Sequence, residues 1–387
     1  GEKPMRICFA GWGHSIHTRV YCEWFARRGH DCFLLTDHVG EIDGVRQVDI
    51  GQTDTNGSSW KRLMCGGINT RFLQDLGILL RARRFLKELR PNIIHLHTLI
   101  HPNELIALAS MGLSIPFVVM PWNGDLLWVL DRSWWQRRMV PWLVKRSELG
   151  LYNSKELKKT LKDCGLIEEK LLSYLGVDIS YFDPKNSYKS HVESMGISSE
   201  RPIVLSTRSL GDFYRLDLIV KSIMLVKETV PKVLFIFCWH WGPTAKEEAF
   251  RKLLNEHGVG SSVLILGKQS QEVLQKLFRA AHIVVSMSEK DSMPRSILEA
   301  MASGTVPIVA QHPGVCELAK NEENALIVPQ GDHIALAKAT IRLLTDSVLR
   351  RRLSRNARKL VEDVADQDKN LSIIEKRYYE IVHGKEF

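Results

Sequence analysis

Two carboxylates, Asp291 and Glu299, bracket a segment whose composition favours the binding of a sugar phosphate. An apolar run at residues 281–286 predicts a strand, and residues 297–302 predict the helix that follows it. The first backbone N–H groups of such a helix carry partial positive charge and suit a diphosphate. Carboxylates beside them accept hydrogen bonds from sugar hydroxyls. An ordinary turn between a strand and a helix is the alternative interpretation.

Two arginines follow another predicted strand, at residues 203–206. Arg208 and Arg215 lie beyond its carboxyl end, where guanidinium groups form paired hydrogen bonds with phosphate oxygens. Such a pair is able to bind a diphosphate. Surface charge is the alternative for two neighbouring arginines taken alone.

The segment at residues 288–304 resembles the E-x7-E signature of the retaining family 4 (group 1) glycosyltransferases, with aspartate replacing the first glutamate. The resemblance implies that Glu299 accepts hydrogen bonds from the donor ribose. It also implies that Asp291 and the backbone N–H groups of Ser292 and Met293 hold the donor sugar, and that the helix terminus after Pro294, a further donor-binding residue, stabilises the diphosphate. Aspartate is one methylene shorter than glutamate, which leaves the identity of the sugar open.

The same resemblance assigns catalytic roles to Arg208, Arg215 and Asp291. The two arginines would neutralise the departing diphosphate, and Arg215 would replace the lysine that the family has there. Tyr214 competes for that lysine position. Asp291 would act on the donor sugar.

Three further segments carry the resemblance. Gly267 and Lys268 end a predicted strand where the family contacts the nucleobase. Residues 238–243 retain only the last glycine and proline of the family's glycine-rich loop, and their tryptophans suit either ligand contact or the core. Residues 311–317 resemble the family's later glycine loop and glutamate, although a glutamate near a helix start is also favourable for local reasons.

Candidates for the acceptor side occur at strand ends in the first half of the chain. In the resembling family the loop after the first strand contacts the diphosphate or the acceptor, which implies a donor contact for Gly13 and an acceptor contact for His14. His97, Asn123 and Asp125 are further acceptor or cleft candidates. A histidine that the family often has near position 123 is missing, so no general base is inferred there.

A metal site is not expected. His95, His97 and His101 lie close in the sequence, but alternate strand residues share a face only in pairs, and no carboxylate spacing completes the set. The resembling family has no D-x-D metal motif, and none occurs here in a suitable loop. The expected reaction is therefore metal-independent, with a nucleoside-diphosphate sugar as substrate and no cofactor.

Composition favours a soluble globular protein with two domains. The chain has 387 residues, of which 44% are hydrophobic and 25% charged, and no apolar run reaches about 18 residues. Its seven cysteines are scattered without a C-x-x-C pair, which argues against a disulfide framework or structural zinc. Met5 is the expected natural start. We expect a cytoplasmic protein.

Positive charge is concentrated in one part of the chain. The net charge is +9, and residues 61–146 hold thirteen Lys and Arg against five Asp and Glu. Residues 133–146 interleave tryptophans with basic residues, which predicts contact with an anionic membrane surface at its inner face. An amphipathic helix with buried tryptophans is the alternative. No nucleic-acid-binding signature is found, so no nucleic-acid partner is expected.

Apolar strands alternate with helices along the whole chain, which predicts an α/β fold with parallel sheets. We predict two doubly wound Rossmann-like domains facing a cleft, an arrangement that the resemblance identifies as GT-B. The expected domains are residues 1–183 for the acceptor and 184–366 for the nucleotide sugar. A polar linker is expected at 184–202. The last helix, at 367–387, is expected to pack back on the first domain.

Together these features predict a retaining glycosyltransferase. The expected donor is a nucleoside-diphosphate sugar, UDP- or GDP-linked, and the expected acceptor is a glycan or a lipid-linked glycan. The family implies front-face displacement, in which the leaving diphosphate takes the acceptor's proton. A nucleotide-sugar epimerase of the same architecture and a non-catalytic nucleotide-sugar-binding protein are the alternatives.

Overall fold

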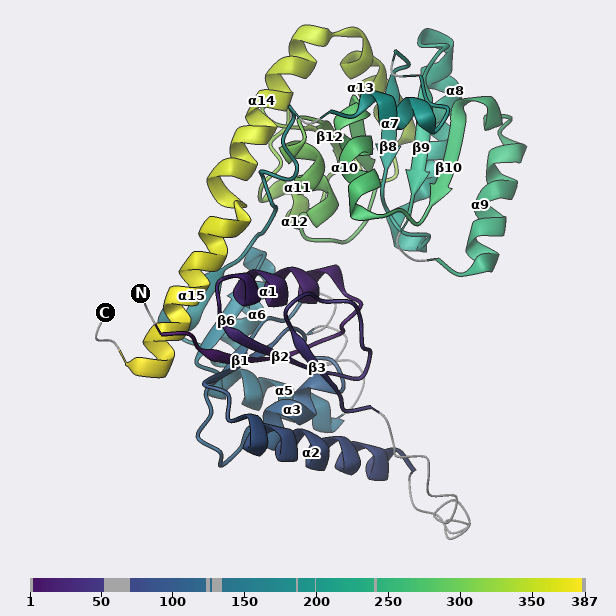
Figure 1. The fold of residues 1–387 in the computed structure, drawn as a ribbon. Helices are drawn as coiled ribbons and strands as arrows, with labels where there is room; N and C mark the ends of the chain where they lie inside the picture. Colours follow the sequence, from purple (N-terminus) through teal and green to yellow (C-terminus); the bar gives the residue numbers. More distant parts are fainter. Residues whose placement is uncertain are drawn as a thin grey trace. The chain divides into compact units, whose positions relative to one another are not determined.

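The computed structural model divides into two compact units, each built on one parallel sheet with helices on both faces (Figure 1). The first unit comprises Gly1–Tyr174 and Leu371–Phe387, and the second comprises Leu175–Asn370. The predicted α/β class with two doubly wound domains is confirmed. The structure describes residues 3–51, 70–122, 126, 134–185, 187–198, 200–239 and 242–384.

The first sheet has seven parallel strands in the order β3-β2-β1-β4-β5-β6-β7. Its five central strands are mostly buried apolar runs, as expected for a parallel sheet covered on both faces, whereas the two edge strands are only partly buried. The strands are β1 Arg6–Ala10, β2 Asp31–Thr36, β3 Arg46–Asp49, β4 Ile93–Leu96, β5 Phe117–Val119, β6 Leu149–Tyr152 and β7 Leu171–Ser173.

Helices cover both faces of this sheet (Figure 1). Helix α1 packs on one face, and α2, α3, α5 and α6 pack on the other. Their bounds are α1 Ile16–Arg27, α2 Thr70–Leu89, α3 Asn103–Ser110, α5 Trp134–Arg146 and α6 Lys155–Asp163. A short 3-10 helix, η2 Glu168–Lys170, precedes β7.

The last helix, α15 Gln367–His383, returns the chain to the first unit. Leu371, Ile374 and Tyr378 are buried in one apolar cluster with Met5 and Phe25. An ion pair adds to this contact, because Glu375 on α15 accepts hydrogen bonds from Arg28 and His30.

The second sheet has six parallel strands in the order β10-β9-β8-β11-β12-β13. The winding direction changes between β8 and β11, so the loops after these two strands emerge side by side. The strands are β8 Ile203–Ser206, β9 Leu234–Cys238, β10 Val263–Gly267, β11 Ile283–Ser286, β12 Val306–Ala310 and β13 Leu326–Val328.

Two apolar clusters cover the faces of the second sheet. The helices that supply them are α7 Lys189–Ser194, α8 Leu216–Thr229, α9 Thr244–Glu256, α10 Gln271–Ala280, α11 Arg295–Ala302, α12 Pro313–Cys316, α13 His333–Thr345 and α14 Ser347–Val364. Short 3-10 helices occur at η3 Asp212–Tyr214 and η4 Gly260–Ser262.

The first passage of the chain between the units differs from the prediction. It falls between Tyr174 and Leu175 rather than after residue 183, because Val177 and Phe182 are already buried in the second core. The polar segment at 184–202 is not a simple linker. It contains α7, and its few apolar side chains, including Val192, are buried in the same core.

Candidate functional site

Arg208 and Asp291 meet at the point where the second sheet changes winding direction. Arg208 follows β8 and Asp291 follows β11, and the Arg208 Nη2 atom lies 2.5 Å from the Asp291 Oδ2 atom. A backbone hydrogen bond also links the loops after β8 and β11, in which the N–H of Glu289 donates to the Phe213 carbonyl at 2.9 Å. Residues 83 positions apart in the sequence therefore form one polar cluster.

Burial and neighbouring positive charge shift the pKa of Asp291 in opposite directions. Burial raises the pKa of its carboxyl group, while the Arg208 guanidinium and the N–H of Ser292 partly offset that rise. The net direction is upward. The Arg208 guanidinium therefore favours the ionised form of Asp291, whereas burial disfavours it.

The Arg208 side chain is enclosed by neighbours that favour a charged ligand beside it. Only 11% of the side chain is exposed, and its guanidinium lies 4.5 Å from the centre of the Tyr214 ring. Burial and the nearby Arg208 charge lower the pKa of His312, which keeps that ring neutral. Within the described part of the chain, the Arg208 Nε atom and the Thr207 hydroxyl have no hydrogen-bond partner. Such buried polar groups are suited to a ligand.

Arg215 is placed differently from Arg208. Its guanidinium donates to Asp217 at 3.0 Å and to Glu289 at 2.6 Å, and these carboxylates raise its pKa. Its backbone is left-handed, with φ of 50°, at the start of α8. Two carboxylates thus already neutralise its charge, and Tyr214 is the side chain that packs on Arg208. The diphosphate role of Arg215 stays a prediction.

Glu299 is buried on α11, with 4% of its surface exposed. Its Oε1 atom accepts hydrogen bonds from Arg295 Nε at 2.8 Å and Gln271 Nε2 at 3.1 Å. No role for Arg295 or Gln271 is predicted from the sequence. The four-residue spacing of Arg295 and Glu299 on one helix could have indicated the first contact, whereas the second depends on tertiary packing.

The start of α11 is held tightly against the core. Met293 and Ser292 are 4% and 8% exposed, and Pro294 immediately precedes the helix. The loop after β12 packs directly on this segment, because a Cβ atom at Gly314 would collide with the Asp291 carbonyl oxygen. A glycine at position 314 is therefore required by the close approach of two loops.

The nucleobase candidates lie at the end of β10. Gly267 has φ of +64°, and its carbonyl accepts a hydrogen bond from the N–H of Trp239 at 3.1 Å. Lys268 is exposed. The Trp239 side chain is buried near Phe250, which favours the core interpretation for this tryptophan. Trp241 lies outside the described residues.

An open hollow of about 630 Å³ lies in the second unit beside these loops. Two ion pairs line it, Arg215 with Glu289 and Lys246 with Asp212. Phe213 also lines it and is 42% exposed. An aromatic face flanked by charged groups suits polar ligands that also have an apolar side.

The candidate binding residues of the first unit differ in burial and in their contacts. Gly13 donates its N–H to the His38 carbonyl at 2.8 Å, and a Cβ there would collide with the backbone of residues 38–40. His14 is exposed and lies beside Trp12. Asn123 and Asp125 lie outside the described residues.

His97 is buried rather than open to solvent. It is 1% exposed, and the centres of the Tyr21 and His95 rings lie 4.8 Å and 5.2 Å from its own. Burial lowers the pKa of His97 to about 3, so the ring is neutral near pH 7. A cleft role for this histidine stays a prediction.

Helix α5 combines a buried face with a basic exposed face. Met139, Val140 and Leu143 are buried, while Trp142 is 41% exposed and lies under the Arg146 guanidinium at 4.4 Å. The side chains of residues 134–136 lie outside the described part. No helix among the described residues is long and apolar enough to cross a membrane.

Metal ligands are not grouped in the part of the chain that the structure describes. No cluster of three or more His, Cys, Asp or Glu side chains there could hold a metal ion. The described cysteines are all unpaired, and burial raises the pKa of Cys8 and Cys238 to about 12.

Two family models match the chain, one over each unit. The model described as Glycosyltransferase Family 4 matches residues 13–181, and the model described as Glycosyl transferases group 1 matches residues 188–360. The chain belongs to the group 1 glycosyltransferases of family 4. The resemblance inferred from residues 288–304 is thereby confirmed.

Curated relatives match part of the chain. N-acetyl-alpha-D-glucosaminyl L-malate synthase of Bacillus anthracis is 26% identical over 188 residues, which are 48% of each chain. D-inositol 3-phosphate glycosyltransferase of Corynebacterium efficiens is 28% identical over 188 residues, 47% of this chain and 44% of its own. The chain spans about half the length of the curated relatives it matches.

Solved structures match the chain over nearly its whole length. Sucrose-phosphate synthase of Thermosynechococcus elongatus has a TM-score of 0.77 at 17% identity, covering 97% of this chain and 98% of its own. Anabaena HepE in complex with UDP-glucose has a TM-score of 0.77 at 18% identity, covering 96% and 99%. These likenesses confirm the predicted GT-B fold.

Proposed function

We propose that this protein transfers a sugar from a nucleoside-diphosphate sugar to a glycan or lipid-linked acceptor, with retention of the anomeric configuration. The observation that carries the proposal is the Arg208–Asp291 pair at the winding switch of the second sheet, and the helix that follows the Asp291 loop carries buried Glu299. Ligands of doubly wound sheets bind at such switch points. The UDP-glucose bound by Anabaena HepE supports a UDP-linked donor.

In this proposal the donor lies along the loops after β8, β10 and β11. Glu299 accepts hydrogen bonds from the ribose, and the base lies at Gly267 and Lys268. Asp291 binds the sugar, with the N–H groups of Ser292 and Met293 beside it. Arg208 then contacts both the diphosphate and Asp291, and its unpaired Nε atom supplies a donor for the former.

Electrostatic stabilisation of the leaving group would dominate the reaction. The bond between the sugar's anomeric carbon and the diphosphate oxygen breaks as the acceptor hydroxyl attacks from the same face. The diphosphate oxygen takes the acceptor's proton, so no separate base is needed. Arg208 and the N-terminus of α11 supply the positive charge that a metal ion supplies elsewhere, which supports a metal-independent reaction.

The acceptor is proposed from the first unit. Helix α5 presents exposed Trp142 together with Arg138, Lys145 and Arg146, and it contains no acidic residue. A basic, tryptophan-bearing face is complementary to anionic lipid headgroups. A lipid-linked acceptor reached from the membrane surface follows from that complementarity.

A thermal-shift screen followed by a turnover assay tests the proposal. UDP, GDP, dTDP and ADP, with their common sugar conjugates, are screened against the wild-type protein and Glu299→Gln. A ligand at about a hundredfold excess over Kd stabilises the folded state by about 2.7 kcal/mol. We expect one nucleotide series to raise the melting temperature, with a smaller rise in Glu299→Gln.

Turnover then separates the candidate activities. A transferase releases free nucleotide only when an acceptor is added, and EDTA leaves the rate unchanged. Conversion of the donor sugar without acceptor would show an epimerase, and binding without either product would show a non-catalytic protein. The absence of a shift with every nucleotide would contradict the proposed donor site.

A further inference from the structure

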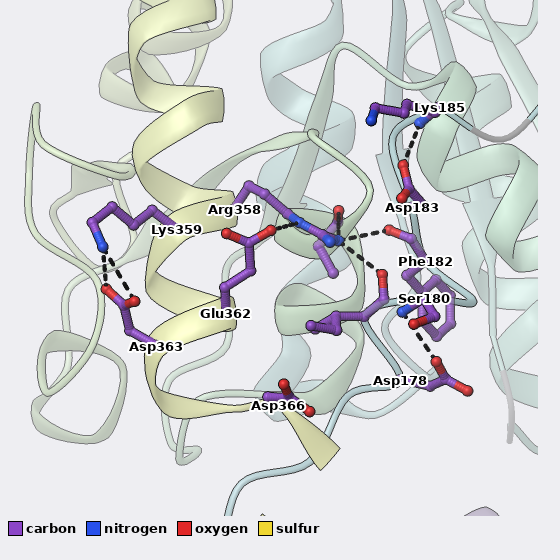
Figure 2. Close-up of polar contacts among 12 residues, drawn as sticks. Asp178, Ser180, Phe182, Asp183, Lys185, Arg358, Lys359, Glu362, Asp363 and Asp366 are labelled. Atoms are coloured by element: carbon purple, nitrogen blue, oxygen red, sulfur yellow. Dashed lines mark hydrogen bonds and ion pairs between the residues drawn. The ribbon is translucent and has the colours of Figure 1, made fainter. Parts of the chain in front are cut away.

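Arg358 on α14 joins two segments that are far apart in the sequence. Its Nη1 atom donates to the carbonyls of Ile179 at 3.1 Å, Phe182 at 3.2 Å and Ala302 at 2.7 Å. Its Nε atom donates to Glu362 at 2.6 Å, which fixes the plane of the guanidinium. Figure 2 shows this group pointing from α14 toward the 178–185 segment, and 17% of the side chain is exposed.

One of the three carbonyls ends the helix that carries Glu299. Ala302 is the last residue of α11, where a positive charge is favourable because the carbonyl end of a helix is partly negative. The same turn is held at two other points. Ser303 donates its N–H to the Glu299 carbonyl at 3.0 Å, and Ser354 of α14 donates to the Gly304 carbonyl at 2.7 Å. Helix α14 therefore fixes the carboxyl end of α11.

The other two carbonyls belong to the segment where the chain enters the second unit. Asp178 shapes this segment by accepting hydrogen bonds from the N–H groups of Ser180 and Tyr181 at 3.1 Å and 2.8 Å. Asp183 does the same for Lys185 at 2.7 Å. These short-range bonds set the local turns (Figure 2).

The exit of the chain from the second unit is bonded to the same entry segment. The N–H of Val177 donates to the Ala365 carbonyl at 2.8 Å, and the N–H of Gln367 donates to the Val177 carbonyl at 3.0 Å. Asn370 adds a side-chain bond to the Leu175 carbonyl at 2.6 Å. Both passages of the chain are thus tied together at the end of α14, within two turns of Arg358.

We propose that Arg358 is a positioning residue, whose guanidinium sets the carboxyl end of α11, and so Glu299, relative to the segment through which the chain enters the second unit. The inference rests on the proposed function, in which Glu299 binds the donor ribose. A guanidinium is required because it reaches three carbonyls and one carboxylate at once. A lysine ammonium has no rigid fork and cannot replace all four contacts.

Hydrogen exchange on the unliganded protein tests the structural part of this proposal. The variants are Arg358→Met, which keeps the length of the stem, and Arg358→Lys, which keeps the charge. Arg355→Met is the control, since Arg355 is exposed on the same helix. In Arg358→Met we expect amide exchange to rise on the order of tenfold at both 178–184 and 299–305, while β8 and β12 exchange as in the wild type.

Equilibrium binding of UDP and GDP tests the functional part. We expect the nucleotide that binds the wild type to bind Arg358→Met on the order of tenfold more weakly. Arg358→Lys should restore part of the affinity, and Arg355→Met should match the wild type. If Arg358→Met does not fold, hydrogen exchange and nucleotide binding are both measured on Arg358→Lys instead.

Two outcomes would overturn the inference. Faster exchange confined to 178–184, with 299–305 unchanged, would make Arg358 a tether of the entry segment alone. Unchanged nucleotide affinity despite faster exchange at 299–305 would show that the end of α11 does not position Glu299. If the wild type binds neither nucleotide, the proposed function fails, and exchange at 299–305 alone decides whether Arg358 fixes α11.

Discussion

The two sheets change winding direction at equivalent places, yet the residues there differ in chemistry. In the second unit the switch between β8 and β11 carries an ion pair, Arg208 with Asp291. In the first unit the switch between β1 and β4 is followed by buried, neutral His97 beside Tyr21. Topology supplies a location for a ligand, whereas the side chains decide which ligand it binds.

The contrast assigns different tasks to the two units. A charged and partly unpaired cluster suits a diphosphate, which needs positive charge held away from water. A neutral aromatic cluster can make apolar contacts with a ligand, but it has no positive charge to balance the negative charge of a diphosphate. In our proposal the charged switch between β8 and β11 therefore binds the donor, and substitutions in the two units should have different effects.

Removing the charge at the second switch should have the largest effect. Arg208→Ala is expected to lower kcat on the order of 10²–10³-fold, because stabilisation of the leaving diphosphate is lost. Steady-state kinetics with the identified donor measures this. Arg251→Ala is the control, since Arg251 forms an exposed pair with Glu247 in the same unit. Near-normal turnover in Arg208→Ala would remove this residue from the mechanism.

Neutralising the buried carboxylate of α11 should have a smaller effect that falls on binding. Glu299→Gln keeps the shape of the side chain but weakens its hydrogen bonds to the ribose. The donor KM is expected to rise on the order of tenfold to a hundredfold, with kcat changed much less. Equal losses in kcat and kcat/KM would instead place Glu299 in the transition state.

In the first unit a charge change should alter stability rather than catalysis. Glu375→Gln removes the charge that Arg28 and His30 contact, and it should lower the free energy of unfolding by about 1–3 kcal/mol. Burial raises the pKa of Glu375, but the hydrogen bonds from Arg28 and His30 outweigh burial, and the net pKa is lowered. Denaturant unfolding of both proteins at pH 7 measures the difference.

The pH dependence of that difference has a defined sign. Because the folded-state pKa of Glu375 lies below its ordinary value of 4.5, its stabilisation is complete above that value. It is lost as the pH falls through the lowered folded-state pKa. The gap between wild type and Glu375→Gln should therefore narrow in acid, and a gap that widens there would contradict the assignment.

The smallest expected effect concerns the basic face of α5. Trp142→Ala should weaken binding to vesicles that contain anionic lipid by a few-fold, since several basic residues remain and each contributes about 1 kcal/mol. Val348→Ala is the matched control, because Val348 is 68% exposed on the second unit. Vesicle co-sedimentation compares the two variants, and equal binding would argue against a membrane role for Trp142.

Much of the fold could be predicted from continuous apolar runs. The bounds of β8 agree with the predicted strand at 203–206, and β11 lies within the apolar run at 281–286, because both strands are buried on both faces. The half-buried edge strand β3 was not predicted, since Arg46–Asp49 lacks such a run. The entry segment at 175–183 was placed in the wrong unit because two buried side chains, Val177 and Phe182, decide its packing.

The candidate site was predicted in its charged residues but not in their partners. Loop positions after predicted strands located Arg208 and Asp291, and the structure brings them together. The Tyr214 ring on Arg208 and the Gln271 bond to Glu299 depend on tertiary contacts that spacing does not reveal. By contrast, the hydrogen bond from Arg215 to Asp217 is a local contact that the sequence could have indicated, because the two residues are only two positions apart.

The most direct test is the equilibrium binding of UDP and GDP to the wild type, Arg208→Ala and Arg251→Ala. We predict that one of the two nucleotides binds the wild type and Arg251→Ala equally, and binds Arg208→Ala at least about tenfold more weakly. Equal affinity for that nucleotide in all three proteins, or no binding by any of them, would contradict the assignment of the β8–β11 switch to a nucleotide-sugar donor.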